Sequence, residues 1–250
     1  MEIYGLFGYP LAHSFSSKFF NLKFQREGIH AEYLNFEIEE VTEVRRVVLS
    51  NLRLKGLNVT IPYKEAILPF LDEVTPEAKA IGAVNAIRVE RSSDNTHGYR
   101  LVGHNTDYIG FKESIVPLLH PTIHRNALVL GTGGASKAVT SALTDLGIGW
   151  KQVSRTPAKE QLGYDELSPE VLKSYTMIIN ATPVGTFPNV DHCPSIPYNF
   201  LTPEHLLYDL VYNPEETLFL KMGKERGASI KNGREMLERQ ALAAWKFWNG

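Results

Sequence analysis

A short polar stripe that ends in a lysine carries the groups best suited to chemistry. It reads Gly56-Leu57-Asn58-Val59-Thr60-Ile61-Pro62-Tyr63-Lys64. Because strand side chains two residues apart share a face, Asn58 and Thr60 are expected to point together, away from the apolar side. Pro62 should end the strand, since it lacks a ladder donor, and Lys64 follows. The pattern indicates a site for a small polar molecule; the alternative is a half-exposed edge strand with a surface lysine.

A glycine-rich turn offers a second kind of site. The strand expected at residues 127–130 runs into Gly131-Thr132-Gly133-Gly134-Ala135-Ser136, and a helix follows. Gly131 permits a tight turn, Gly133 lets the backbone approach a pyrophosphate, and the helix N-terminus supplies free N–H groups. Ser136 stands at the third position of the dinucleotide fingerprint, where glycine or alanine is usual. The context predicts nucleotide binding; the alternative is a tight turn without a ligand.

The end of the next expected strand, residues 149–153, indicates which nucleotide. It continues into Ser154-Arg155-Thr156, and no carboxylate appears before Glu160. NAD enzymes usually carry an acid there to bind the ribose 2′-hydroxyl, whereas an arginine can pair with a 2′-phosphate. Arg155 therefore favours NADP, with hydroxyl donors from its two neighbours. The alternative is an exposed loop arginine.

Two series of alternating strands and helices must position these groups, with a hinge near residues 104–107. This alternation predicts an α/β fold of two domains. The last expected helix covers residues 234–248, and its aromatic residues are interpreted as packing groups. The further expected strands cover residues 3–8, 32–36, 83–89, 99–102, 177–180 and 206–210. The further helices cover 14–27, 41–49, 64–71, 76–81 and 107–119, and another continues from the glycine turn to residue 146.

Composition is that of an ordinary soluble globular protein. The chain has 250 residues and a net charge of −2, which gives no reason to expect nucleic-acid binding. Cys193 is the only cysteine, which fits a cytoplasmic, reducing compartment. We expect no signal peptide, no membrane span and no catalytic metal, because neither apolar runs nor metal-ligand spacing supports them.

Taken together, these motifs resemble the shikimate dehydrogenase family along essentially the whole chain. In chain order they are Gly8-x-Pro10-x-x-His13-Ser14-x-Ser16, Asn58-Val59-Thr60-Ile61-Pro62-x-Lys64, Gly82-Ala83-Val84-Asn85, Asn105-Thr106-Asp107, Gly131-x-Gly133-Gly134-Ala135-Ser136, Arg155-Thr156, Asn180-Ala181-Thr182-Pro183, Tyr208-Asp209-Leu210-Val211-Tyr212-Asn213-Pro214 and Gly233-x-x-Met236-Leu237-x-x-Gln240.

The resemblance implies an NADP-dependent oxidoreductase that reversibly reduces 3-dehydroshikimate to shikimate, in the pathway to chorismate and the aromatic amino acids. It implies two α/β domains with a cleft between them. Residues 1–105 plus 233–250 would form the substrate-binding and catalytic domain, and residues 106–232 a Rossmann domain that binds NADP. The expected partners are the small-molecule substrates, without nucleic acid or membrane, and the expected assembly is a monomer or homodimer.

The resemblance also implies residue roles. The catalytic pair would be Lys64 and Asp107. The substrate contacts would be Ser14, Ser16, Asn58, Thr60, Asn85, Tyr212 and Gln240. The cofactor contacts would be Gly131, Gly133, Gly134, Ala135, Ser154, Arg155, Thr156 and Thr182. Three residues depart from the family pattern: Ser154 replaces a common Asn, Tyr108 a common Gly, and Glu235 the glycine that normally lies beside the nicotinamide.

These residue types suit the implied reaction. The nicotinamide carries the hydride, so the protein must orient the substrate and move a proton. Negative charge builds on the carbonyl oxygen as hydride reaches its carbon, and an ammonium can stabilise that charge and donate the proton. Lys64 would be this group, and Asp107 would orient it and favour its charged form.

Two other activities remain open from the sequence. One is quinate/shikimate dehydrogenase with NAD as an alternative cofactor, although Arg155 argues against NAD. The other is a non-catalytic NADP sensor, against which the retained Lys64 and Asp107 speak. Methylenetetrahydrofolate dehydrogenases share the broad architecture, but the polar stripe does not suit them.

Overall fold

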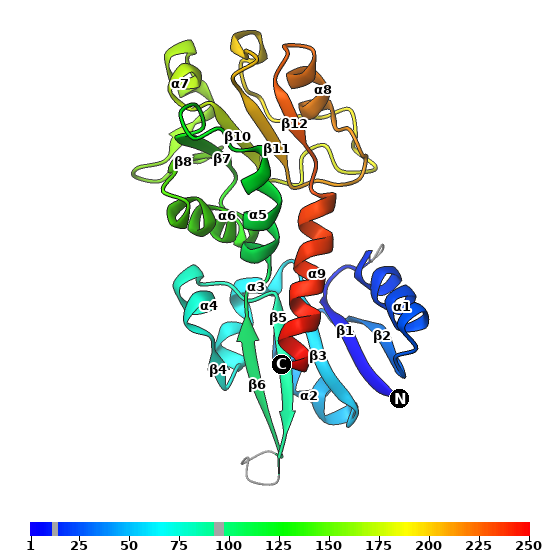
Figure 1. Ribbon diagram of the computed structural model, residues 1–250. Coiled ribbons are helices and arrows are strands. Elements are labelled where there is room, and N and C mark those ends of the chain that lie inside the picture. The colour runs from blue at the N-terminus through cyan, green and yellow to red at the C-terminus, as the bar shows by residue number, and fades with distance from the viewer. Residues whose placement is uncertain (12–14, 93–97) are drawn as a thin grey trace. The chain divides into compact units, whose positions relative to one another are not determined.

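The computed structural model describes residues 1–11, 15–92 and 98–250. The chain divides into two compact units (Figure 1). The first unit contains Met1–Thr106 and Ala241–Gly250, and the second contains Asp107–Gln240. One boundary follows Thr106, within the predicted hinge, and the other falls inside the last helix.

The first unit is built on a six-stranded mixed sheet with the order β2-β1-β3-β5-β6-β4. β3 lies inside this sheet, parallel to β1 and antiparallel to β5. The interpretation of the polar stripe as an edge strand is therefore wrong, because partners distant in sequence pair with both sides of it. The strands are β1 (Glu2–Gly8), β2 (Ala31–Glu37), β3 (Leu54–Val59), β4 (Glu73–Val74), β5 (Ala86–Arg91) and β6 (Tyr99–His104).

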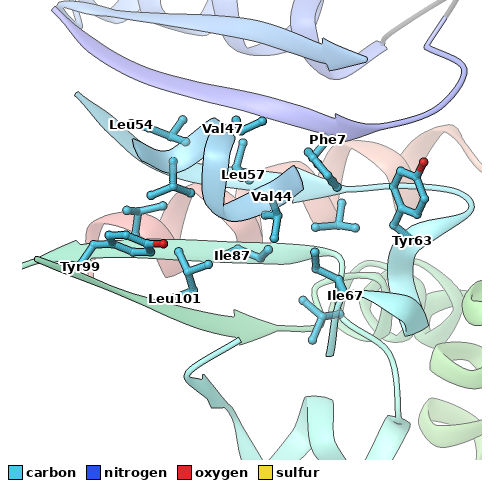
Figure 2. Close-up of a cluster of buried hydrophobic side chains, with 14 of the residues drawn as sticks. Phe7, Val44, Val47, Leu54, Leu57, Tyr63, Ile67, Ile87, Tyr99 and Leu101 are labelled. Carbon is cyan, nitrogen blue, oxygen red and sulfur yellow. The ribbon is translucent and has the colours of Figure 1, made fainter. Parts of the chain in front are cut away.

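Both faces of this sheet are covered. On β1, Phe7 faces one core and Tyr4 faces the other, as the alternation of strand side chains requires. The first core packs α2 and the segments after β3 against the sheet (Figure 2). The second packs α1 and the end of the last helix. The helices of this unit are α1 (Phe15–Glu27), α2 (Val44–Ser50), α3 (Tyr63–Ala66) and α4 (Pro76–Ile81), with 3₁₀ turns at Val41–Glu43 and Leu68–Phe70.

The polar stripe alternates as predicted up to the end of β3. Leu57 and Val59 belong to the first core, whereas Asn58 points to the opposite face. Beyond Val59 the strand ends, and Ile61 is 68% exposed instead of continuing the apolar side. The expected helix over residues 64–71 is two short pieces, α3 and a 3₁₀ turn.

The second unit holds a six-stranded, wholly parallel sheet with the order β12-β11-β10-β7-β8-β9. The order runs outward in both directions from the β7–β10 pair, which makes this pair the switch point of a doubly wound sheet. The strands are β7 (Asn126–Leu130), β8 (Gly149–Ser154), β9 (Leu162–Gly163), β10 (Met177–Asn180), β11 (Leu206–Asp209) and β12 (Ser229–Lys231).

Helices cover both faces of this sheet, and its central strands β7 and β10 are apolar apart from one terminal asparagine each. Side chains of α5, α6 and the start of α9 form one core, and those of α7 and α8 form the other. These helices are α5 (Asp107–Ile115), α6 (Gly134–Asp145), α7 (Pro169–Ser174), α8 (Leu218–Lys224) and α9 (Arg234–Asn249), with 3₁₀ turns at Val116–Leu118, Tyr164–Glu166 and Tyr198–Phe200. No helix in the described part of the chain is both long and apolar enough to cross a membrane.

Candidate functional site

Asn58 is the most buried polar group of the stripe, with 4% of its surface exposed. Its Oδ1 accepts a hydrogen bond of 2.8 Å from the Tyr33 hydroxyl, and its Nδ2 donates one of 3.2 Å to the carbonyl oxygen of Asn85. Burial raises the pKa of the Tyr33 hydroxyl, and the buried Ser16 of α1 lies close enough to lower it in part. Tyr33 thus holds one predicted substrate contact, Asn58, and lies near a second, although the sequence did not single it out.

Asn85 lies beside Asn58 at the start of β5. Its Oδ1 accepts a hydrogen bond of 2.6 Å from the backbone N–H of Thr106, and its Nδ2 donates one of 3.0 Å to Thr106 Oγ1. Thr106 is fully buried and directly precedes Asp107. The side chain of Asn85 therefore fixes the chain one residue before the predicted catalytic acid.

Lys64 is placed by the turn after β3. Pro62 forms the N-cap of α3, and the Lys64 carbonyl accepts a hydrogen bond of 2.7 Å from the N–H of Val84, the residue before Asn85. The Thr60 backbone bonds to Phe7 and Tyr63, and its side chain is half-buried. The structure thus gathers Asn58, Thr60, Lys64 and Asn85 around the end of β3 and the start of β5, while Ser16 is buried on α1. Ser14 lies outside the described residues.

The glycine turn follows β7 at the switch point of the parallel sheet. Gly131 has a φ of +107°, a region that favours glycine, and a Cβ there would lie 2.9 Å from Thr182 Cγ2. Gly133 is the N-cap of α6, and a Cβ there would meet no atom within 4 Å. The helix N-terminus thus has open space beside its N–H groups, as an anion-binding turn needs.

Ser136 is compatible with this turn because its side chain folds back into it. Its hydroxyl donates a hydrogen bond of 2.7 Å to the carbonyl of Gly133, and the residue is fully buried. The hydroxyl also accepts a hydrogen bond of 3.3 Å from Gln152 Nε2. The serine therefore stabilises the glycine turn instead of obstructing it.

The end of β8 presents an exposed cation. Arg155 is exposed and forms no ion pair with any residue in the ranges that the structure describes. Ser154 Oγ accepts a hydrogen bond of 3.2 Å from the N–H of Thr156, so this hydroxyl helps shape the turn. The arrangement leaves the Arg155 guanidinium available for an external phosphate.

A buried polar network fixes the loops after β10 and β11. Asp209 accepts hydrogen bonds from Asn180 Nδ2 at 3.0 Å and from Thr217 Oγ1 at 2.6 Å. Burial raises the pKa of Asp209 to about 6, against the effect of these hydrogen bonds. Asn180 Oδ1 accepts from the Thr182 hydroxyl at 2.6 Å, and Tyr212 follows on the second loop, half-exposed. The network places Thr182 beside Gly131 and gives Asp209 a structural role.

Two helices of the second unit carry Asp107 and Gln240. Asp107 is the first residue of α5 and is 6% exposed. One turn later, a Cβ on Gly110 would lie 2.5 Å from the carbonyl oxygen of Met236 and 2.9 Å from Gln240 Cβ. The backbones of α5 and α9 therefore meet closely, and this contact fixes Asp107 and Gln240 within one unit.

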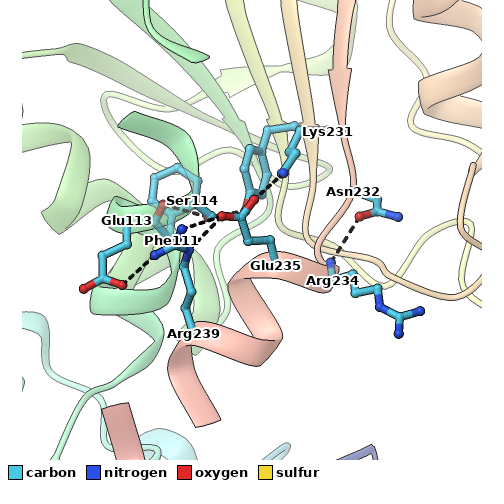
Figure 3. A network of polar contacts seen from close by, with 9 residues as sticks. Phe111, Glu113, Ser114, Lys231, Asn232, Arg234, Glu235 and Arg239 are labelled. Atoms are coloured by element: carbon cyan, nitrogen blue, oxygen red, sulfur yellow. Dashed lines mark hydrogen bonds and ion pairs between the residues drawn. The ribbon is translucent and has the colours of Figure 1, made fainter. Parts of the chain in front are cut away.

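Glu235, which replaces a family glycine, is held by its neighbours. Its carboxylate pairs with Lys231 of β12 and, at 2.7 Å, with Arg239 on the next turn of α9 (Figure 3). The hydrogen bond from Lys231, and to a smaller extent the one from Arg239, lowers the pKa of the Glu235 carboxyl. Arg239 in turn pairs with Glu113 of α5 at 3.1 Å. The Glu235 charge is therefore balanced within the second unit.

Comparisons with known proteins agree with this architecture. The family model described as shikimate dehydrogenase substrate binding domain matches residues 6–87. A shikimate dehydrogenase (NADP(+)) of Desulforamulus reducens is 34% identical over 100% of this chain and 90% of its own length. The chain belongs to the shikimate dehydrogenase family.

Solved structures of this family share the fold. A crystal structure of a shikimate dehydrogenase in complex with NADP+ has a TM-score of 0.86 and 33% identity, covering 100% of this chain and 90% of its own. A quinate dehydrogenase from Corynebacterium glutamicum in complex with NAD has a TM-score of 0.84 and 26% identity, covering 100% and 94%. The resemblance to shikimate dehydrogenases and the α/β fold class are thereby confirmed.

Proposed function

We propose that this protein catalyses the reversible NADPH-dependent reduction of 3-dehydroshikimate to shikimate in the biosynthesis of chorismate and the aromatic amino acids. The observation that carries the proposal is similarity over the full chain to enzymes named shikimate dehydrogenase (NADP(+)). The protein is an oxidoreductase of the cytoplasm, a location that its single cysteine supports. It acts as a monomer or homodimer on small molecules.

The first unit supplies neutral groups for a polyhydroxylated ring. Ser16, Asn58 and Asn85 are buried, and protein hydrogen bonds already hold the two asparagines, so these are ordered before substrate arrives. The second Nδ2 hydrogen of Asn58 has no acceptor within the described part of the chain, and a ring hydroxyl fits it. Thr60 and Ser14 complete this set. Tyr212 and Gln240, from the second unit, are the remaining substrate contacts.

The second unit has the features that NADP requires. The open space at Gly133 and the α6 N-terminus suit the pyrophosphate, with Gly131, Gly134 and Ala135 in the same turn. Arg155 suits the adenosine 2′-phosphate, assisted by Ser154 and Thr156, and Thr182 lines the pocket. When bound, the nicotinamide supplies the hydride. The protein residues bind and orient this cofactor beside the substrate.

Lys64 moves the proton. Its Nζ donates a proton to the substrate oxygen on which negative charge develops, and accepts it back in the reverse direction. Asp107 is the acid that orients the ammonium and favours its charged form. Lys64 suits this role because a bond to Val84 fixes its backbone next to Asn85, close to the groups that hold the ring.

The deciding experiment follows NADPH absorbance with purified protein and 3-dehydroshikimate, then NADP or NAD with shikimate and with quinate. We expect shikimate oxidation with NADP to be much faster than quinate oxidation or oxidation with NAD. Faster quinate oxidation would favour quinate dehydrogenase instead. Binding of NADP without turnover of either acid would favour a sensor.

A further inference from the structure

Tyr33 occupies the centre of the polar groups in the first unit. It lies on β2 with 2% of its surface exposed, while Asn58 lies on β3. β1 separates these two strands in the sheet, so the tyrosine side chain reaches across β1 to donate its 2.8 Å hydrogen bond to Asn58 Oδ1. One hydroxyl of β2 thus holds a side chain of β3 across the strand between them.

The position of this hydroxyl is fixed from both ends of the residue. The backbone N–H of Tyr33 donates to Asn21 Oδ1 at 2.9 Å, and Asn21 Nδ2 donates back to the Tyr33 carbonyl at 3.0 Å. The ring stacks on Phe20 with centroids 4.8 Å apart and an interplanar angle of 10°. Trp248 packs against the same Phe20 at 5.3 Å. The ring has little freedom to move, and its hydroxyl is held in one place.

The hydrogen bond from Tyr33 and the one to the Asn85 carbonyl together fix the orientation of the Asn58 amide. A donor opposite one end of the amide requires the carbonyl oxygen there, which places Nδ2 at the other end. From that end, one hydrogen reaches the Asn85 carbonyl and the second remains for a ligand. Without the tyrosine hydroxyl, Oδ1 would be buried without a partner, and the Asn85 carbonyl alone would hold the side chain that presents its second hydrogen to a ligand.

We propose that Tyr33 is a positioning residue that orients Asn58 for hydrogen bonding to the substrate. It acts through this residue and does not itself touch the substrate. The inference rests on the proposed function, because that function assigns Asn58 to the substrate. It adds a residue to which neither the motifs nor the family similarity gave a role.

The test compares Tyr33→Phe with Tyr4→Phe. Tyr4 lies in the same aromatic cluster and is 1% exposed, but its hydroxyl bonds to Glu2 and Asn249, away from the polar set. Both substitutions remove one buried hydroxyl and keep the ring. We expect Tyr33→Phe to raise the KM for shikimate about ten-fold, with the KM for NADP unchanged, and Tyr4→Phe to change neither.

A double-mutant cycle with Asn58→Ala checks the route. If Tyr33 acts through Asn58, Tyr33→Phe should add little to the KM of Asn58→Ala, whereas independent effects would multiply. The inference would be overturned if the two substitutions multiplied their effects on the shikimate KM. It would also be overturned if Tyr33→Phe left the shikimate KM unchanged, or changed it no more than Tyr4→Phe does.

A ligand-free measurement separates this inference from the proposed function. In the wild-type protein, the Asn58 side-chain NH₂ signals should exchange slowly with water in NMR spectra. They should exchange faster in Tyr33→Phe and stay slow in Tyr4→Phe. If the wild type failed to oxidise shikimate, the proposed function would be lost, but this comparison would still decide whether Tyr33 orients Asn58. Unchanged exchange in Tyr33→Phe would contradict it.

Discussion

Trp248 of α9 packs directly against Gly56 of β3. A Cβ built on Gly56 would lie 2.5 Å from the Cγ of the Trp248 indole, and two further ring atoms would lie within 2.6 Å. The last helix therefore closes the core of the first unit at the strand that leads to Asn58 and Lys64. The aromatic residues of this helix pack as the sequence indicated, and the close approach requires glycine beneath the ring.

Gly56→Ala should destabilise the protein, because the added methyl group must displace the indole. Overpacking of this kind costs about 1–3 kcal/mol, which corresponds to a melting temperature lowered by roughly 2–12 °C. Gly133→Ala is the matched control, since its Cβ would meet nothing within 4 Å. Thermal unfolding of both variants would test this. Equal melting temperatures would show that Trp248 can move aside.

Arg155→Ala should weaken the use of NADP and leave the use of NAD unchanged. The lost interaction is a charge-assisted hydrogen bond to phosphate, so the KM for NADP should rise roughly ten- to hundred-fold. Steady-state rates with each nucleotide measure this effect. Arg226→Ala, at another exposed site of the second unit, is the control. An equal loss with NAD would contradict recognition of the 2′-phosphate.

Lys64→Ala should lower kcat and leave the KM for NADP close to that of the wild type. General acid–base catalysis by one group accelerates a reaction roughly a hundred- to ten-thousand-fold, so kcat should decrease by a factor in that range. Lys79→Ala, which removes an exposed lysine from α4, should keep full activity. Wild-type kcat in Lys64→Ala would exclude the proton-transfer role.

Asp209 should make the stability of the protein depend on pH in an unusual direction. Its folded pKa of about 6 lies above the ordinary value of 3.8. Between these values the folded state binds more protons than the unfolded state, so this group's contribution falls as pH rises from about 4 to 6. Below that window the Asp209 carboxyl is protonated, and its burial costs little free energy. Above the window the carboxylate is charged, and its burial destabilises the folded state.

Denaturant unfolding of the wild type and Asp209→Asn at several pH values would measure this contribution. The wild-type advantage in free energy of unfolding should shrink by about 2 kcal/mol between pH 4 and pH 6.5, because the asparagine does not titrate. Subtracting the variant cancels the carboxylates whose pKa values are lowered, such as Glu235. A constant difference across this window would contradict the raised pKa.

The sequence predicted what depends on local spacing. The alternation of Leu57 and Asn58 gave the correct faces of β3, and the glycine turn was correctly placed between a strand and a helix. It did not predict that β3 is central, because its partners β1 and β5 come from distant parts of the chain. Tyr33 was missed for the same reason: its hydroxyl meets Asn58 across an intervening strand, and nothing in its neighbours indicates this.

The hydrogen bonds of Asn85 have a consequence for redesign of substrate preference. The amide of Asn85 is both a proposed ring contact and the clamp on Thr106, the residue before Asp107. A substitution chosen to accept a bulkier acid would therefore also release the start of α5. Selection for new substrates should accept changes more readily at Thr60, which is half-buried at the end of β3, than at Asn85.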